Sequence, residues 1–212
     1  MFNVCPQCGI YDPCKVIEKK DGNTIAICPN CNYGHMFNIL PFFILIGASG
    51  TGKSTICLNL AGRDLPAVPM ESDILWRKEF DTPDTGYREY RELWLRLCKN
   101  IAAGGKPVLL CGCGEPSQYE KCIERRYFKA LHYLALVCDE DILIRRLKGR
   151  PSWRSTSGEK FIEAHVEYNR WLKENADKTN PPITVLDTSS SLVKETVEQV
   201  EEWLNRNSNK DM

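Results

Sequence analysis

An apolar run that leads directly into a glycine-rich loop constrains this chain more than any other feature. Residues Phe42 to Ile46 have the length and composition of a buried parallel strand, and the loop that follows reads G-x-x-x-x-G-K-S. Its glycines, Gly47 and Gly52, permit a tight turn whose inward-facing N–H groups form a nest for phosphate oxygens. Lys53 adds an ammonium for the β- and γ-phosphates, and Ser54 offers a hydroxyl to Mg²⁺. A chance glycine-rich turn is disfavoured by the strand before the loop and the helical pattern after it.

The loop predicts binding of a nucleoside triphosphate, with ATP and Mg²⁺ as cofactors. The helix that follows adds free N–H groups and the positive end of its dipole, both of which favour an anion. The residues expected to hold the nucleotide are Gly47, Ala48, Ser49, Gly50, Thr51, Gly52, Lys53, Ser54 and Thr55.

Two cysteine pairs near the N-terminus indicate a metal site. The pattern C-x₂-C occurs at Cys5 and Cys8 and again at Cys28 and Cys31, with nineteen residues between the pairs. Four thiolates in two close pairs suit the tetrahedral preference of Zn²⁺. An Asp-Gly turn between two apolar segments predicts a β-hairpin between the pairs. Residues 1–38 therefore resemble a zinc ribbon, in which bound metal would contribute folding free energy. Two disulfides, or reactive thiols, are the alternative.

Composition favours a reduced, cytoplasmic protein. The eleven cysteines are an odd number, and several of them fall in apolar helix or strand patterns. We find no stretch with the flanks of a signal peptide and no apolar run long enough to span a membrane. The formal net charge is zero, which argues against a dedicated nucleic-acid binder and favours a small-molecule substrate. The sequence does not indicate an oligomeric state.

From residue 39 to residue 212 the chain alternates strand and helix patterns, which predicts an α/β fold with three layers and a doubly wound, five-stranded parallel sheet. The expected strands are 42–46, 67–70, 108–111, 133–137 and 183–186. The helices expected after the phosphate loop are 87–103, 116–125, 139–149 with Asp139 as its cap, 159–175 and 192–205. The predicted organisation is thus a ribbon over 1–38 and a P-loop domain over 39–212.

The order of these parts over residues 40 to 206 resembles the small-molecule P-loop kinases of the nucleoside monophosphate, shikimate and gluconate kinase type. Three local marks carry the resemblance: Glu71-Ser72-Asp73 after the second strand, the helix 142–150, and Leu186-Asp187-Thr188 before the last helix. In that family a basic lid follows the fourth strand's helix, so Arg150 and Arg154 resemble lid arginines, and Arg146 is a further candidate. Such groups would neutralise charge on a transferring phosphoryl group.

The resemblance also implies roles for the acidic cluster. Asp73 would act as general base toward an acceptor hydroxyl, or orient it, with Glu71 as the alternative for that role. Asp73 and Ser54 would hold Mg²⁺. A helix N-cap is the structural alternative for Asp73. The implied catalytic set is Lys53, Asp73, Arg150 and Arg154.

The third strand departs from many P-loop proteins because it ends in Cys111-Gly112-Cys113-Gly114, without an Asp. The absence of an Asp at this position argues against a motor or switch ATPase. Cys111 and Cys113 would either form a redox or metal pair or leave room for an acceptor through their small size.

Two hypotheses follow: a kinase that moves the γ-phosphoryl of ATP to a small metabolite such as a nucleoside or nucleotide, and an ATP-binding adaptor whose ribbon docks a protein or nucleic-acid partner.

Overall fold

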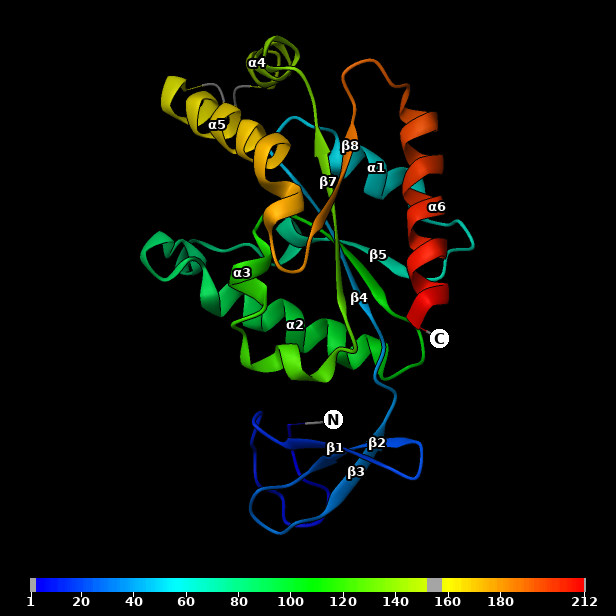
Figure 1. The fold of residues 1–212 in the computed structure, drawn as a ribbon. Helices are drawn as coiled ribbons and strands as arrows, with labels where there is room; N and C mark the ends of the chain where they lie inside the picture. Colours follow the sequence, from blue (N-terminus) through cyan, green and yellow to red (C-terminus); the bar gives the residue numbers. More distant parts are fainter. Residues whose placement is uncertain (1–2, 152–157, 212) are drawn as a thin grey trace.

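The computed structural model describes residues 3–151 and 158–211. Within these ranges the strands form two sheets, an antiparallel sheet of order β1-β2-β3 and a five-stranded parallel sheet of order β5-β6-β4-β7-β8 (Figure 1). The strands are β1 (Val16–Lys20), β2 (Asn23–Ile27), β3 (Gly34–Phe37), β4 (Phe42–Gly47), β5 (Val68–Glu71), β6 (Val108–Cys111), β7 (Leu131–Val137) and β8 (Ile183–Asp187). The predicted parallel sheet and N-terminal hairpin are confirmed.

Helices cover both faces of the parallel sheet (Figure 1). The α-helices are α1 (Lys53–Leu60), α2 (Arg88–Ala102), α3 (Pro116–Tyr119), α4 (Glu140–Lys148), α5 (Glu159–Asn175) and α6 (Val193–Asp211). Short 3₁₀ helices are η1 (Ser72–Leu75), η2 (Lys78–Phe80), η3 (Pro83–Thr85), η4 (Ile123–Tyr127) and η6 (Ala176–Lys178). In the described ranges, none of the helices combines the length and the apolarity that crossing a bilayer requires.

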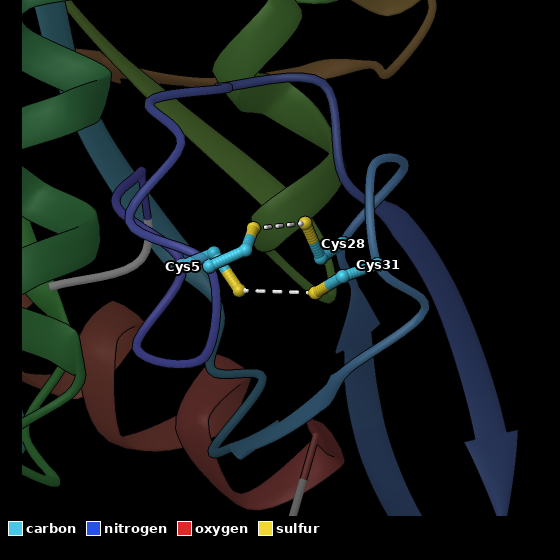
Figure 2. A group of neighbouring side chains, drawn as sticks. Cys5, Cys28 and Cys31 are labelled. Carbon is cyan, nitrogen blue, oxygen red and sulfur yellow. Dashed lines mark hydrogen bonds between the residues drawn. The ribbon is translucent and has the colours of Figure 1, made fainter.

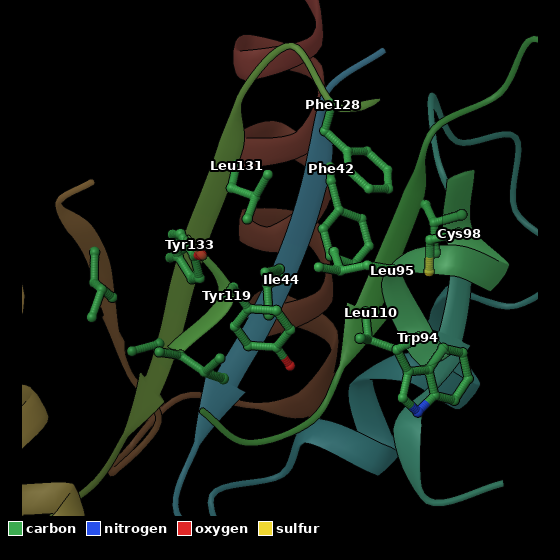
Figure 3. Close-up of a cluster of buried hydrophobic side chains, with 14 of the residues drawn as sticks. Phe42, Ile44, Trp94, Leu95, Cys98, Leu110, Tyr119, Phe128, Leu131 and Tyr133 are labelled. Atoms are coloured by element: carbon green, nitrogen blue, oxygen red, sulfur yellow. The ribbon is translucent and has the colours of Figure 1, made fainter. Parts of the chain in front are cut away.

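The central strand β4 is buried on both faces, as its continuous apolar sequence predicts. Phe42 and Ile44 point to the face covered by α2 and α5, where they pack with Trp94 and Leu95 (Figure 3). The intervening Phe43 points to the other face, against α1 and α6. This two-sided burial fixes β4 in the middle of the sheet, so the loop that follows it emerges at the centre of one sheet edge.

Three strand ends meet at that edge. β4 ends at Gly47, β5 at Glu71 and β6 at Cys111, and the parallel pairing places Glu71 directly beside Cys111. Gly112 permits this close approach, because a Cβ added there would lie 2.7 Å from the hydroxyl oxygen of Ser72. Ligands of open α/β sheets bind at such carboxyl-terminal edges.

Two expected helices differ in the structure. The segment predicted as one helix over 116–125 is divided into α3 and η4, because the carboxylate of Glu92 on α2 accepts hydrogen bonds from the N–H groups of Ile123 (2.6 Å) and Glu124 (3.1 Å) and so caps η4. Asp139 precedes α4 as expected, but its side chain makes no cap hydrogen bond; it accepts one from Lys173 at 3.3 Å instead.

The N-terminal sheet lies below α2 in the view of Figure 1. The segment that precedes it contacts α2 and η4 through buried polar side chains. Lys99 on α2 and Glu124 on η4 form an ion pair, with their side chains 2% and 0% exposed. Asn3 joins this pair, since its Nδ2 donates to Glu124 Oε1 at 3.2 Å and its Oδ1 accepts from Lys99. Apolar contacts accompany it: the Phe37 ring on β3 lies 6.0 Å from the Tyr127 ring in an edge arrangement. The segment before Cys5 therefore contacts the larger sheet's helices directly.

Candidate phosphate-binding site and metal centre

The loop after β4 adopts a glycine-dependent conformation. Gly47 has φ 147°, and a Cβ there would lie 2.5 Å from the carbonyl oxygen of Leu136, so only glycine fits. Gly52 is likewise left-handed, and α1 begins at the next residue. Lys53 Nζ lies over the loop, where it donates hydrogen bonds to the carbonyl oxygens of Gly47 (2.7 Å) and Ala48 (2.9 Å). The ammonium thus lies against the loop at the N-terminus of α1, and a cation beside a helix N-terminus suits an anion.

A cavity of about 540 Å³ opens above this loop. Its lining comes from the loop and from segments far apart in the sequence, including Glu71, Asp73, Cys113, Arg150 and Thr188. The structure therefore brings together the loop, the acidic cluster after β5 and the first of the two expected lid arginines. Arg154 lies outside the described residues.

Glu71, rather than Asp73, lies against the loop hydroxyl. Ser54 Oγ donates a hydrogen bond to Glu71 Oε1. Asp73 is exposed in the same cavity, and its Oδ1 accepts from Ser72 Oγ at 3.3 Å. A hydroxyl and a carboxylate oxygen at one point are the donor set that Mg²⁺ prefers, so Ser54 and Glu71 fit the ion together. Glu71 supplies from β5 the carboxylate that the end of β6 lacks.

Two arginines hold the far side of the loop. Arg150 Nη1 donates to Ser49 Oγ at 2.8 Å. Arg146, on the last turn of α4, donates to the carbonyl oxygen of Thr188 at 3.0 Å and so ties α4 to the segment after β8. Both arginines line the cavity, with Arg150 half-buried and Arg146 exposed.

The two cysteines at the end of β6 have different surroundings. Cys111 is 2% exposed and packs in the core cluster that contains Cys57. Cys113 is exposed at the cavity, where its thiol donates to the carbonyl oxygen of Gly47 at 3.5 Å. Within the described residues, they are absent from the one cluster whose spacing suits a metal ion.

A buried arginine near the cavity was not anticipated. Arg91 on α2 is 6% exposed, and its guanidinium lies 5.7 Å and 5.6 Å from the rings of Tyr87 and Tyr119. One nitrogen donates to Gln118, while Nε and Nη1 have no hydrogen-bond partner among the described residues. Because burying an unpaired cationic group is costly, these nitrogens are poised for an anionic partner. No local sequence pattern singles out Arg91, because it lies in an ordinary amphipathic helix.

The N-terminal cysteines form a second site. Their four Sγ atoms lie within 4.8 Å of one another, with Cys5 and Cys31 at 3.6 Å and Cys8 and Cys28 at 3.8 Å (Figure 2). A tetrahedral Zn²⁺ with Zn–S bonds of 2.3 Å places its sulfurs about 3.8 Å apart, and the two cross-pair distances of 3.6 Å and 3.8 Å are close to this value. All four thiols are free rather than paired in disulfides. Hydrogen bonds from the Ile10 backbone and the Asn30 side chain lower the pKa of Cys8 to about 6, which favours its thiolate. At Cys31 the Tyr33 backbone hydrogen bond is outweighed by burial and by the neighbouring thiols, which raise its pKa to about 12.

The fold and the cavity define a P-loop protein with a kinase-like architecture. The chain belongs to the AAA-domain family, whose sequence profile matches residues 44–166, more than half of its length. Comparison with curated proteins gave no significant sequence match.

Solved structures with this fold include two named as carbohydrate kinases. A sugar kinase from Janibacter sp. HTCC2649 aligns with a TM-score of 0.57 and 15% identity over 79% of this chain and 95% of its own. A gluconokinase from Sinorhizobium meliloti 1021 aligns with a TM-score of 0.56 and 19% identity over 82% of this chain and 96% of its own. At these identities the likeness concerns the fold.

Proposed function

We propose that this protein is an ATP-dependent phosphotransferase that moves the γ-phosphoryl group to a small metabolite. One observation carries the proposal: a phosphate loop with its lysine, a hydroxyl–carboxylate pair, a second carboxylate and an arginine all line the same cavity. Phosphoryl transfer requires alignment of the reactants and neutralisation of charge, and this set of groups supplies both. An ATP-binding adaptor would need the phosphate loop, but its function would not require a second carboxylate and an arginine that line the same cavity.

Each group has a distinct role in the proposal. The loop N–H groups and Lys53 bind the β- and γ-phosphates, and Arg150 neutralises the charge that develops on the transferring group. Bound Mg²⁺, held by Ser54 and Glu71, would supply further charge neutralisation. Asp73, which the Ser54–Glu71 pair leaves available, accepts the proton of the acceptor hydroxyl. Arg154 is proposed to assist Arg150.

The acceptor is proposed to carry an anionic group. Arg91 lies beside Gly114, because a Cβ added to that glycine would stand 3.4 Å from Arg91 Nε. Arg91 does not itself line the cavity, so a carboxylate or phosphate on the acceptor would have to displace the segment around Gly114 to accept a charge-assisted hydrogen bond from Nε. That contact would favour a nucleotide or a sugar acid over a neutral nucleoside.

We further propose residues 1–38 as a zinc ribbon that supports the P-loop domain of residues 39–212. The buried contact of Asn3 with Lys99 and Glu124 supports this role, since it ties the segment carrying Cys5 to α2 and η4. Free thiols and a zinc site both suit a reducing compartment such as the cytoplasm.

The test is ATP consumption by the whole chain with Mg²⁺ and a panel of nucleotides, nucleosides, sugar acids and shikimate-like acids. The proposal expects ADP to form faster with one acceptor class than without any acceptor. Lys53→Ala abolishes this increase, and Asp73→Asn lowers it by about a hundredfold or more while leaving Mg-ATP affinity unchanged. An ATP-binding chain whose turnover no acceptor raises above the Lys53→Ala level would contradict the proposal and favour the adaptor.

A further inference from the structure

A histidine far along the sequence contacts the phosphate loop. His165 on α5 accepts a hydrogen bond at Nδ1 from the backbone N–H of Ser49, with a donor–acceptor distance of 3.2 Å. The same residue of the loop receives a second contact, because Arg150 donates to the Ser49 hydroxyl. Ser49 is thus held through its backbone by α5 and through its side chain by the segment after α4.

The contact belongs to a row of polar side chains on one face of α5. Tyr168 donates its hydroxyl to the carbonyl oxygen of Gly114 at 2.8 Å. Asn169 accepts from the Cys138 N–H at 3.1 Å and donates to the Cys138 carbonyl at 2.8 Å. Positions 165, 168 and 169 follow the i, i+3, i+4 spacing that places residues on one helix face. This face of α5 therefore contacts the segments that follow β4, β6 and β7, of which the first two supply residues that line the cavity.

The imidazole is held as a neutral acceptor. Its ring packs edge-on against Phe161 on the preceding turn, with ring centroids 4.2 Å apart. Burial, and then the charges of Lys53 and Arg150, lower the pKa of His165 to about 4. A neutral ring that accepts at Nδ1 carries its proton on Nε2, so the hydrogen bond to Ser49 fixes the tautomer. A protonated ring would have no lone pair for the Ser49 N–H.

We propose that His165 is a positioning residue that fixes the Ser49 peptide, and through it the shape of the phosphate loop, for nucleotide binding. The inference rests on the proposed ATP-binding function of the loop and adds a residue of α5 to it. Without the imidazole as hydrogen-bond acceptor, the Ser49 peptide would rotate. The backbone N–H groups that follow Ser49 in the loop would then no longer point in a common direction. The expected consequence is weaker binding of Mg-ATP with little effect on the chemical step, because His165 does not itself line the cavity.

The test compares two substitutions at one position. His165→Asn keeps an acceptor, since its Oδ1 can take the place of Nδ1, whereas His165→Leu has similar bulk and none. With the whole chain and Mg-ATP as the probe, we expect His165→Leu to weaken the measured Kd by about tenfold, the effect of one lost hydrogen bond, and His165→Asn to stay within about twofold of wild type. The KM for ATP should rise in the Leu variant while kcat changes little. Glu163→Gln, an exposed residue of the same helix, is the control.

A second measurement does not depend on nucleotide. The Ser49 amide proton should exchange slowly in wild type and in His165→Asn but faster in His165→Leu, by backbone amide NMR at equal thermal stability. Equal exchange in all three proteins, or an Asn variant as impaired as the Leu variant, would overturn the inference. If wild type binds no Mg-ATP, the proposed function fails while the amide measurement still decides the role of His165.

Discussion

Glu71 on the last position of β5 accepts a hydrogen bond from Ser54 on the first turn of α1. This contact places a carboxylate at the point where the phosphate loop presents its hydroxyl, although β6 ends in Cys111 rather than in an acidic residue. It also separates the two carboxylates after β5, because Asp73 stays exposed in the cavity.

The division of roles between these carboxylates can be measured by Mg²⁺ dependence. Glu71→Gln removes the anionic oxygen beside Ser54, so the Mg²⁺ concentration that half-saturates ATP turnover should rise by about tenfold or more, as for loss of one charged ligand. Asp73→Asn should leave this concentration unchanged and lower the maximal rate instead. The roles are reversed if Asp73→Asn shifts the Mg²⁺ requirement and Glu71→Gln does not.

The cysteine cluster predicts bound zinc. Purified chain should contain one Zn²⁺, and Cys8→Ser should lose the metal and unfold at a lower temperature, because a small module without a large core depends on its metal for folding. Cys14→Ser is the matched control, since Cys14 is an exposed thiol of the same segment outside the cluster. Metal analysis and thermal unfolding give the readout. Full zinc content in Cys8→Ser would refute the assignment.

The buried ion pair of Lys99 and Glu124 predicts that replacing one partner lowers the free energy of unfolding much more than replacing both. Lys99→Met leaves the Glu124 carboxylate buried beside one remaining strong cation, Arg96 at 3.0 Å, and should cost about 3–5 kcal/mol in the free energy of unfolding. Adding Glu124→Leu should recover much of that loss, because no uncompensated charge stays buried.

The control for the ion pair is Lys194→Met. Lys194 pairs with Glu198 at 3.9 Å on the surface of α6, where such a pair contributes about 0.5 kcal/mol or less. Denaturant unfolding measures all three variants. A cost for Lys99→Met no larger than that for Lys194→Met would show that the buried pair does not stabilise the packing of η4 on α2.

The lowered pKa of His165 predicts a pH effect with a defined sign. The unfolded chain protonates this imidazole near pH 6.5, whereas in the folded chain burial, and then the charges of Lys53 and Arg150, keep it neutral to a pKa of about 4. Between these values the unfolded state binds more protons, so this residue lowers stability as the pH falls through that window. In His165→Asn the contribution is absent. Unfolding temperatures from pH 7.5 to 4.5 should therefore fall more steeply for wild type than for the variant, and parallel curves would contradict the prediction.

The sequence predicts the parallel sheet well, because the strands are continuous apolar runs between turn signals. Val108–Cys111 and Glu159–Asn175 have the expected bounds. Strand β3 was not predicted, because Gly34–Phe37 is short. Its register with β2 is defined only once the hairpin has folded. The division of 116–125 depends on Glu92, a partner more than twenty residues away that no local pattern reveals.

The site residues that belong to one continuous segment could be predicted from the sequence. Those whose roles depend on contacts between distant segments could not. The loop residues follow from their own spacing. Which carboxylate faces Ser54 depends on where β5 ends, and the structure ends it at Glu71, one residue beyond the expected strand. His165 and Arg91 occupy ordinary helical positions, and their importance comes from Ser49, 116 residues before His165, and from burial among aromatic rings.

Kinase activity requires that the γ-phosphoryl group leave ATP for a small acceptor. The most direct measurement incubates the whole chain with Mg²⁺, ATP isotope-labelled at the γ-phosphoryl group and a small-molecule metabolite extract, followed by mass spectrometry of labelled products. We expect a labelled organic phosphate that carries a second anionic group, formed with wild type and absent with Lys53→Ala. Label found only in inorganic phosphate, or only in unreacted ATP, would contradict it.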